Sequence, residues 1–384
     1  MTRYTAEQLA GGAVSVFGAF DFDRRGEGVS PRRMPAWTRS QLPRVMDVMV
    51  RMPSGVRLAF TTNAREIRLD VQTTRTVTPP QAPRLVAFDL VVDGRQLHSR
   101  ASDQGNTIYL NRDDPDDYRL ERRPAYQVVF DELGEGDKRC ELWLPHNAFV
   151  ELRALEVDSG AVIEPQPQPQ ANRWIHYGSS ISHCLEAETP TGTWPAVAAA
   201  IAGLHLTSLG FGGQCHLDQF VARTIRDLPA DLISLKVGIN VINMDSMRER
   251  VFMPALHGFL DTIREGQPDT PIVLVSPIYC PSAESRPGPT FPDARGKFVT
   301  LTGFEAMQDG CLTLTRVREI VADVVEVRRR GGDANLRYLN GLELFGAADA
   351  ADLPDDLHPN PAGYRRMGER FARLLAQQQT RIIT

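Results

Sequence analysis

The sequence predicts two domains, an all-β domain followed by an α/β domain, and three observations support this prediction. The chain has 384 residues, which is more than one hydrophobic core usually serves. Its first half contains short segments in which polar and apolar residues alternate, whereas its second half alternates apolar strand-like runs with amphipathic helical runs. A segment rich in proline and glutamine separates the halves.

The pattern over residues 1–159 is typical of a β-sandwich or jelly roll, because many short strands follow each other at fairly regular spacing. Turn residues such as Asp93-Gly94 fall between the apolar runs. No long helix is expected in this half. The candidate strands are Arg44 to Val50, Val56 to Phe60, Ile67 to Val71, Ala87 to Val92, Thr107 to Leu110, Tyr126 to Phe130, Arg139 to Leu144 and Val150 to Val157.

Residues 160–171 are predicted to form a linker. From Glu164 to Gln170, proline alternates with glutamic acid or glutamine. Each proline fixes its own φ and biases the preceding residue toward extended geometry, so the segment should act as a semi-rigid spacer.

Residues 172–384 are predicted to form a parallel sheet that helices cover on both faces. In such folds, ligands bind at the carboxyl ends of the strands. The expected strands are Arg173 to Tyr177, Leu206 to Leu209, Leu232 to Val237, Ile272 to Ser276 and Leu336 to Leu339. The expected helices are Trp194 to Leu204, Leu217 to Asp227, Met247 to Glu265, Leu312 to Arg330 and Pro361 to Gln378.

Composition excludes several classes of protein. A net charge of −5 argues against a nucleic-acid binder, which would carry a concentrated basic face. No apolar stretch is long enough to cross a membrane, and no signal-peptide pattern follows Met1, so a cytoplasmic location is expected. The five cysteines include no Cys-x-x-Cys pair, which favours reduced thiols over a disulfide framework.

Two of the predicted strands end in segments that could expose a nucleophile and backbone donors. Gly178-Ser179-Ser180-Ile181-Ser182 suits a tight turn that exposes a hydroxyl group, although serines also populate ordinary loops. It is not the Gly-x-Ser-x-Gly elbow of α/β-hydrolases, because position 182 is serine. Gly210 to Gln214 is glycine-rich, but a dinucleotide-binding fingerprint would require glycine where Cys215 stands.

Two further segments add an amide and an acid–histidine pair. Gly238-Ile239-Asn240 ends the third strand with an amide that can donate a hydrogen bond to a developing oxyanion. Asp355 precedes His358 by three residues, a spacing at which the carboxylate can orient the imidazole. Either segment alone could be local capping. Together the four segments should lie on one rim of the sheet and supply a nucleophile, oxyanion donors, a base and its orienting acid.

In these segments the sequence resembles the SGNH hydrolase superfamily, also called GDSL-like esterases and lipases. The family has Ser, Gly, Asn and His blocks in this chain order. The segments that match are Gly178 to Ser182, Gly213, Gly238-Ile239-Asn240 and Asp355 to His358. The resemblance covers roughly residues 172 to 380 and implies a flavodoxin-like three-layer α/β/α fold. The chain looks like a subgroup with a β-sandwich ahead of the hydrolase domain.

The resemblance implies a Ser180, His358 and Asp355 triad, with the oxyanion held by the backbone of Ser180 and Gly213 and by the Asn240 amide. No cofactor and no metal are implied. The family's aspartic acid before the nucleophile is Ser179 here, so local support of the serine loop should differ. Asp356 is the neighbouring acid, but the three-residue spacing favours Asp355.

Two features remain open. His183-Cys184 and Cys215-His216 lie on the same rim, so a zinc site is conceivable, although pocket lining is the preferred interpretation because neither pair has tight ligand spacing. The stretch from Cys280 to Asp309 is long and rich in proline and glycine. It is interpreted as a lid or binding loop, with disorder as the alternative.

The function predicted from these residues is hydrolysis of short-chain esters, acetyl above all, of a carbohydrate or natural product through an acyl-enzyme. The acetyl preference rests on analogy alone. Thioester hydrolysis or acyl transfer by the same triad is the first alternative. A non-catalytic carbohydrate- or partner-binding protein is the second. The expected partner is a small-molecule or carbohydrate ester, and a homo-oligomer is possible.

Overall fold

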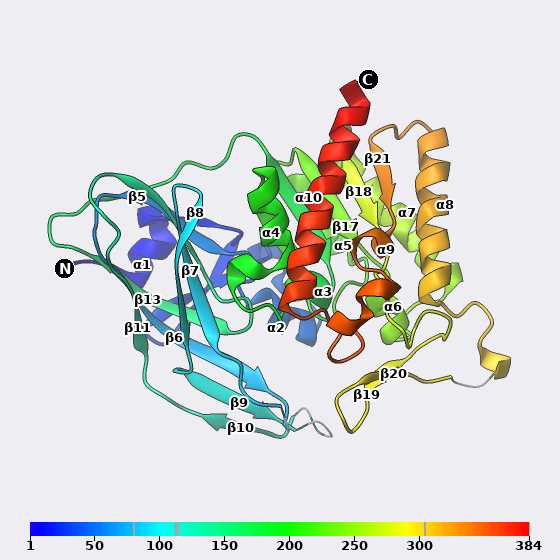
Figure 1. The fold of residues 1–384 in the computed structure, drawn as a ribbon, viewed down its shortest axis with the longest axis horizontal. Coiled ribbons are helices and arrows are strands. Elements are labelled where there is room, and N and C mark those ends of the chain that lie inside the picture. The colour runs from blue at the N-terminus through cyan, green and yellow to red at the C-terminus, as the bar shows by residue number, and fades with distance from the viewer. Residues whose placement is uncertain (80, 112–113, 115, 303–304, 384) are drawn as a thin grey trace. The chain divides into compact units, whose positions relative to one another are not determined.

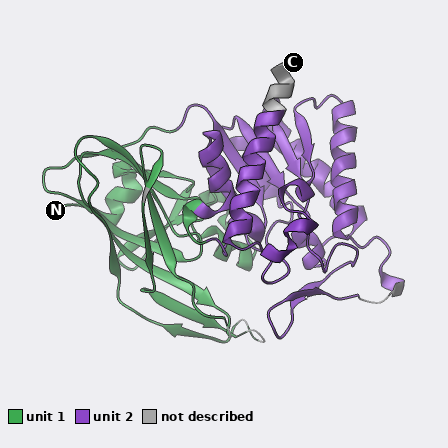
Figure 2. Cartoon of the chain, in the orientation of Figure 1, with its two compact units in different colours: residues 1–168, 188–191 green, residues 169–187, 192–384 purple. Residues whose placement is uncertain are grey.

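The computed structural model describes residues 1–79, 81–111, 114, 116–302 and 305–383. The chain folds as two compact units (Figure 2). Residues 1–168 and 188–191 form the first unit, and residues 169–187 and 192–384 form the second. The excursion of residues 188–191 into the first unit has no counterpart in the sequence pattern. There the side chain of Asp89 accepts hydrogen bonds from the backbone and the hydroxyl group of Thr191, at 3.0 and 2.5 Å.

The first unit consists of two β-sheets that share one apolar core, and the ribbon in Figure 1 shows its long strands. One sheet has the order β10-β9-β6-β13-β4-β3, with β1 beside β13 and β11 beside β6; the other has the order β14-β5-β12-β7-β8, with β2 beside β5. The strands of the first sheet are β1 (Thr2–Thr5), β3 (Asp21–Arg25), β4 (Gly28–Arg32), β6 (Ile67–Val77), β9 (Asn106–Leu110), β10 (Tyr118–Glu121), β11 (Tyr126–Phe130) and β13 (Phe149–Val157). Those of the second are β2 (Ser15–Phe17), β5 (Arg57–Thr62), β7 (Val86–Val92), β8 (Arg95–Ser102), β12 (Lys138–Trp143) and β14 (Ile163–Pro165).

The alternation along β6 explains how this unit folds. Its odd-numbered residues, from Ile67 to Val77, are buried, and its even-numbered residues are half-exposed. Successive side chains of a strand point to opposite faces, so β6 packs one face on the core and turns the other outward. The β-sandwich prediction is therefore confirmed, whereas the jelly-roll connectivity stays a prediction.

Two predictions for this half are wrong in detail. Residues Arg44–Val50 form helix α2 rather than a strand, because Met46 and Val50, four residues apart, bury the same helical face. Within the predicted linker of residues 160–171, Ile163–Pro165 form strand β14, which pairs with β5. Ile163 is buried there, and Pro165 is tolerated because β14 lies at a sheet edge.

The second unit contains a five-stranded parallel sheet in the order β16-β15-β17-β18-β21. Numbered along the chain, this order is 2-1-3-4-5, the flavodoxin-like arrangement. The α/β prediction is therefore confirmed. The strands are β15 (Arg173–Gly178), β16 (His205–Gly210), β17 (Leu232–Lys236), β18 (Ile272–Val275) and β21 (Leu336–Leu339).

Helices cover both faces of this sheet. In Figure 1, α4 (Trp194–Ala202) and α10 (Pro361–Ile383) lie together in front of it, and α5 (Gln219–Asp227) and α7 (Glu249–Gly266) lie behind. Helix α8 (Leu314–Arg330) packs on β21 and β18. Three short helices follow strand ends: α3 (Ser180–His183), α6 (Ile239–Asn243) and α9 (Gly341–Leu344).

The predicted loop from Cys280 to Asp309 contains a two-stranded hairpin. Its strands are β19 (Thr290–Pro292) and β20 (Phe298–Thr300), which pair antiparallel. Residues 303 and 304 of the predicted loop lie outside the described residues. The start of the loop is fixed by the buried Arg318, which donates to both carboxylate oxygens of Glu284 at 2.7 Å and to the backbone carbonyl of Pro277.

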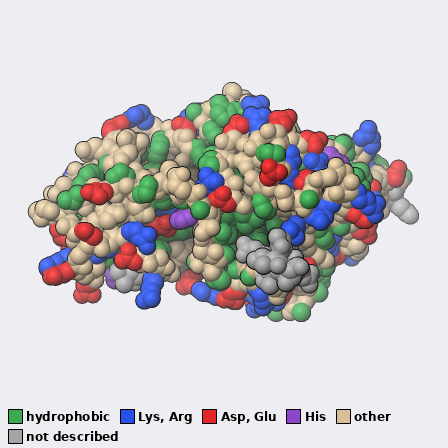
Figure 3. Space-filling view, turned by 90° about the horizontal axis from the view of Figure 1, so that it is seen from above, with side chains coloured by type: hydrophobic (Ala, Val, Ile, Leu, Met, Phe, Trp, Pro, Cys, Tyr) green, Lys and Arg blue, Asp and Glu red, His purple; other side chains and the backbone are tan. Residues whose placement is uncertain are grey.

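Two further observations concern membrane-spanning helices and surface charge. Among the described residues, no helix is long and apolar enough to cross a membrane. On the face shown in Figure 3, basic and acidic side chains are interspersed, so this face carries no single-sign patch.

Candidate active site

The candidate site lies where the strand order reverses, between β15 and β17. Ligands of open α/β sheets bind in the crevice outside the strand ends at this point. Ser180 follows β15 as the first residue of α3, and Asn240 follows β17 within α6. His358 lies in the loop that leads to α10.

Three predicted residues form one continuous hydrogen-bonded chain. Ser180 Oγ lies 2.9 Å from His358 Nε2, and His358 Nδ1 lies 2.7 Å from Asp355 Oδ2. A carboxylate can only accept, so Nδ1 carries the proton and neutral Nε2 is the acceptor for the serine hydroxyl. This is the tautomer in which the imidazole can take the proton of Ser180.

Asp355 is held rigidly for this contact. Its Oδ1 accepts from the backbone N–H groups of Leu357 and His358, at 2.9 and 2.6 Å. Burial alone would raise the pKa of Asp355, but the hydrogen bond from the His358 side chain and the two backbone donors outweigh it and lower the pKa below its usual value. Asp355 therefore stays ionised beside the histidine.

The turn from Gly178 to Ser182, called the serine turn below, packs against the ends of strands β15 and β16. The residue that ends each strand must therefore be glycine. A Cβ atom at Gly178 would lie 2.3 Å from Ser182 Oγ, and one at Gly210 would lie 2.5 Å from the carbonyl carbon of Ser182. Ser179 caps α3 through its side chain, which accepts from Ile181 N at 3.4 Å. Serine thus supplies a local contact at the position where the family has aspartic acid.

The glycine-rich loop from Gly210 to Gln214 is hydrogen-bonded to the serine turn and to His216. Phe211 N donates to the carbonyl of Gly178 at 2.9 Å, which joins this loop to the serine turn. Gly213 has a φ of +68°, which glycine adopts without strain. Its carbonyl accepts from Gln214 Nε2 at 2.8 Å and from His216 Nε2 at 3.0 Å. The loop therefore has a fixed shape.

The orientation of the Asn240 amide follows from one contact. Its Oδ1 accepts from Cys215 N at 2.9 Å, and Asn240 is 4% exposed. Since a backbone N–H cannot accept, the carbonyl oxygen must face Cys215, and the NH₂ group points the other way. Among the described residues this NH₂ group has no hydrogen-bond partner, so it is available as a donor.

The residues weighed for zinc have other contacts. The Cys184 thiol donates to Ile181 O, the Cys215 thiol to Lys236 O, and His216 Nδ1 lies 2.9 Å from Ser246 Oγ. Burial raises the pKa of Cys215 to about 12 and that of Cys184 well above its usual value, so both are neutral thiols at neutral pH in this structure. Within the part of the chain that the structure describes, no three His, Cys, Asp or Glu side chains group as metal ligands.

Sequence reasoning missed a buried polar network beneath the serine turn. His176 is fully buried, and its two ring nitrogens lie 2.7 Å from Ser234 Oγ and 2.8 Å from Ser182 Oγ. Desolvation, with the nearby charge of Lys236, lowers the pKa of His176 to about 3. The histidine is therefore neutral at neutral pH. Its only sequence signal was a polar residue inside an otherwise apolar strand.

The hairpin also contacts the triad, which the sequence did not reveal. Phe298 donates its backbone N–H to Asp355 O at 2.8 Å, and its ring lies edge-on to the His358 ring, with centroids 5.5 Å apart. Lys297 Nζ lies 3.2 Å from Asp356 Oδ1. Asp356 thus pairs with the hairpin, while Asp355 pairs with the histidine.

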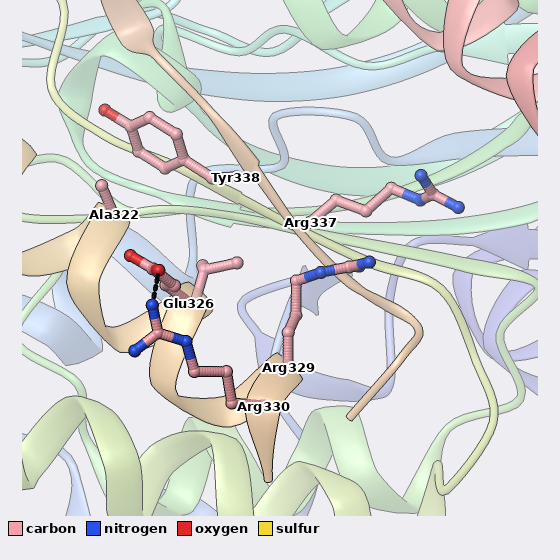
Figure 4. A pocket seen from close by; sticks show the side chains of 7 residues that line it. Ala322, Glu326, Arg329, Arg330, Arg337 and Tyr338 are labelled. Atoms are coloured by element: carbon pink, nitrogen blue, oxygen red, sulfur yellow. Dashed lines mark hydrogen bonds and ion pairs between the residues drawn. The ribbon is translucent and has the colours of Figure 1, made fainter. Parts of the chain in front are cut away.

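A pocket of about 610 Å³ between α8 and β21 lies apart from these residues (Figure 4). None of its lining residues belongs to the triad or to the loops that carry it. Two of the three arginines that line it are already engaged: Arg330 pairs with Glu326, and Arg329 donates to the carbonyls of Ala334 and Leu336. The triad, not this pocket, therefore marks the candidate site.

Comparison with known proteins places this geometry in a family. The sequence profile of the GDSL-like lipase/acylhydrolase family matches residues 176–366, and that of the SsfX3 N-terminal domain matches residues 14–153. A solved structure of the salicylyl-acyltransferase SsfX3, from a tetracycline biosynthetic pathway, is 30% identical with a TM-score of 0.81, over 98% of this chain and 97% of that one. The chain belongs to the GDSL-like lipase/acylhydrolase family.

Other members of this fold are more distant. A putative GDSL-like lipase from Bacteroides ovatus is 20% identical, with a TM-score of 0.70, over 98% of this chain and 97% of that one. A family two carbohydrate esterase from Clostridium thermocellum, solved with cellohexaose, is 14% identical, with a TM-score of 0.59, over 95% of this chain and 99% of that one. At these identities the likeness shows the fold alone. Among curated proteins, none matches the chain significantly.

Proposed function

We propose that the protein is a serine ester hydrolase that cleaves short-chain esters, acetyl esters above all, of a carbohydrate or natural product. The observation that carries this proposal is the unbroken chain from Ser180 Oγ through His358 to Asp355, at 2.9 and 2.7 Å. Family membership supports the general chemistry of acyl transfer to water or an alcohol.

The proposed reaction begins with attack of Ser180 Oγ on the ester carbonyl carbon, while the hydroxyl proton moves to His358 Nε2. The oxyanion accepts hydrogen bonds from the backbone N–H groups of Ser180 and Gly213 and from the Asn240 amide. The carbon–oxygen bond to the alcohol then breaks, and His358 returns the proton to the leaving alcohol. Water, deprotonated by His358, attacks the acyl-enzyme and releases the acid and free Ser180.

The test is hydrolysis of p-nitrophenyl esters from acetyl to octanoyl by wild type and Ser180→Ala, with and without added zinc. We expect turnover that depends on Ser180, is indifferent to zinc and falls with chain length. Turnover that Ser180→Ala leaves intact, or turnover that requires zinc, would refute the triad. A rise toward octanoyl would refute the short-chain preference alone.

Acyl transfer to an alcohol is a second candidate, because the 30% identical structure is a salicylyl-acyltransferase that matches along nearly the whole chain. The same triad serves both reactions, since only the acceptor of the acyl group differs. Partitioning of the acyl-enzyme between water and added alcohols separates the two candidates. Ester product in excess of free acid at low alcohol concentration would identify a transferase.

A further inference from the structure

A cleft of about 310 Å³ is lined by residues of the first unit alone, and none of the triad residues belongs to that unit. Its floor is the outward face of five neighbouring strands, β9, β6, β13, β4 and β3, and helix α2 contributes to its wall. We call it the sheet-face cleft; the residues used below are Ser30, Gln72, Thr74, Asn106, Ile108 and Phe149. Its volume is at the lower end of the roughly 300–1,000 Å³ typical of small-molecule sites.

The strand register places an aromatic ring and polar groups in one row. Thr74 of β6 is opposite Asn106 of β9 on one side and Phe149 of β13 on the other. Ile108 shares the face of Asn106, because the two are separated by two positions on one strand. The cleft thus combines an apolar surface with an adjacent line of hydrogen-bonding side chains.

Several polar groups in the cleft retain hydrogen-bonding capacity. Ser30 is 7% exposed, and its hydroxyl group has no partner among the described residues. Gln72 uses only its NH₂ group, which donates to Thr73 O at 3.2 Å, so its carbonyl oxygen is available. Asn106 is oriented by Arg123 N, which donates to Oδ1 at 2.9 Å, and by its own bond to Thr74 Oγ1 at 3.3 Å. One N–H of its amide remains for a ligand.

The charged side chains of the cleft are mostly neutralised within the protein. Arg51 contacts Asp47 at 2.6 Å and Asp23 at 3.2 Å. Glu151 pairs with Arg153 at 3.1 Å. A charged ligand would have to compete with these pairs, whereas a neutral ligand with several hydroxyl groups would not.

We propose that the sheet-face cleft is a binding site for a neutral saccharide. A sugar ring has an apolar face of C–H groups, which fits against Phe149 and Ile108. It also has a rim of hydroxyl groups, each of which donates and accepts, and these match Ser30, the Gln72 carbonyl and the Asn106 amide. This site is independent of the catalytic proposal, because it shares no residue with the triad.

The test is titration calorimetry of the full chain with xylotetraose, cellotetraose and glucuronate. We expect saturable binding of at least one tetrasaccharide by wild type and by Ser180→Ala. Gln72→Ala and Asn106→Ala should each weaken it about tenfold, the effect of losing one or two hydrogen bonds. The matched control is Gln127→Ala, an exposed residue of β11 in the same sheet and outside the cleft, which should bind as wild type does. Thermal unfolding checks that each variant is folded.

Three outcomes would overturn the proposal. The first is that wild type binds neither tetrasaccharide. The second is that Gln72→Ala and Asn106→Ala both bind as tightly as wild type, which would place the binding elsewhere in the chain. The third is tighter binding of glucuronate than of either tetrasaccharide, which would show an anion site instead. Failure of ester hydrolysis would leave this test unaffected, since binding is measured without turnover.

Discussion

Asp355 and Asp356 are neighbouring carboxylates with different environments. Asp355 bonds the imidazole of His358 and two backbone N–H groups, whereas Asp356 has a positive φ of 67° and points to Lys297. The two side chains therefore form a matched pair for mutation, because they differ in contacts but not in chemistry.

We expect Asp355→Asn to lower kcat on p-nitrophenyl acetate by about 10⁴-fold, because an amide cannot hold His358 in the required tautomer. Asp356→Asn should change kcat by less than about threefold, since its exposed pair with Lys297 is weak. Steady-state kinetics of both variants decide the point. Equal losses would show that the assignment of the orienting acid is wrong.

The Asn240 amide is expected to act only while negative charge develops on the substrate oxygen. Asn240→Ala should therefore lower kcat by about 10²–10³-fold with little change in KM. Asn243→Ala, at the end of the same short helix α6, is the control and should retain most of the activity. A normal kcat in Asn240→Ala would remove this residue from the oxyanion site.

At the scale of elements, the β19–β20 hairpin has two unlike faces. Phe298 faces the triad and contacts the His358 ring, whereas Phe291 and Val299 form a cross-strand pair that is exposed. The hairpin thus supports, from one side, the loop that carries His358.

Phe298→Ala should lower kcat/KM by roughly tenfold, because the His358 ring loses a contact that restricts its position. Phe291→Ala removes the same ring from the opposite face and should leave kcat/KM near the wild-type value. Kinetics on one ester, with thermal unfolding as a check of folding, measures both. A larger loss in Phe291→Ala would point instead to substrate binding on the exposed face.

Because of His176 on strand β15, the free energy of unfolding should depend on pH. Its pKa in the folded protein is about 3, below the ordinary 6.5 that it regains on unfolding. Between these values the unfolded state binds the extra proton, so the free energy of unfolding falls as pH falls from 6.5 toward 3. Urea unfolding across this range measures how many protons are taken up on unfolding, from the slope of the unfolding free energy against pH. His176→Gln should take up fewer protons than wild type, by up to one. Identical slopes would contradict the burial of a neutral histidine.

At the scale of the whole molecule, the five cysteines are free thiols, and four of them are buried. Only Cys311 is partly exposed. We expect Ellman's reagent to label at most one thiol quickly in the native protein and five after unfolding in guanidinium chloride. Fewer than five in the unfolded state without reductant would reveal a disulfide.

The two units also differ in what local sequence predicts. The apolar parallel strands of the second unit were predicted within one or two residues, because burial on both faces leaves a continuous apolar run. In the first unit, seven strands were missed, and α2 was taken for a strand; the missed strands are β1, β2, β3, β4, β8, β10 and β14. A short amphipathic segment fits both the helical and the strand repeat of apolar residues, so tertiary packing decides which structure it forms.

The sequence by itself determined the α/β class of the second unit, the order of its strands and helices, and the residue types of the candidate site. These follow from hydrophobic period, from the position of Ser180 and Asn240 just after apolar strands, and from that of His358 just before the last helix. Only the tertiary structure decided which partners each side chain meets. The pair of Asp356 with Lys297, the hairpin against His358, the network of His176 and the sheet-face cleft all join residues distant in sequence. Such contacts depend on sheet order and register, which no local pattern encodes.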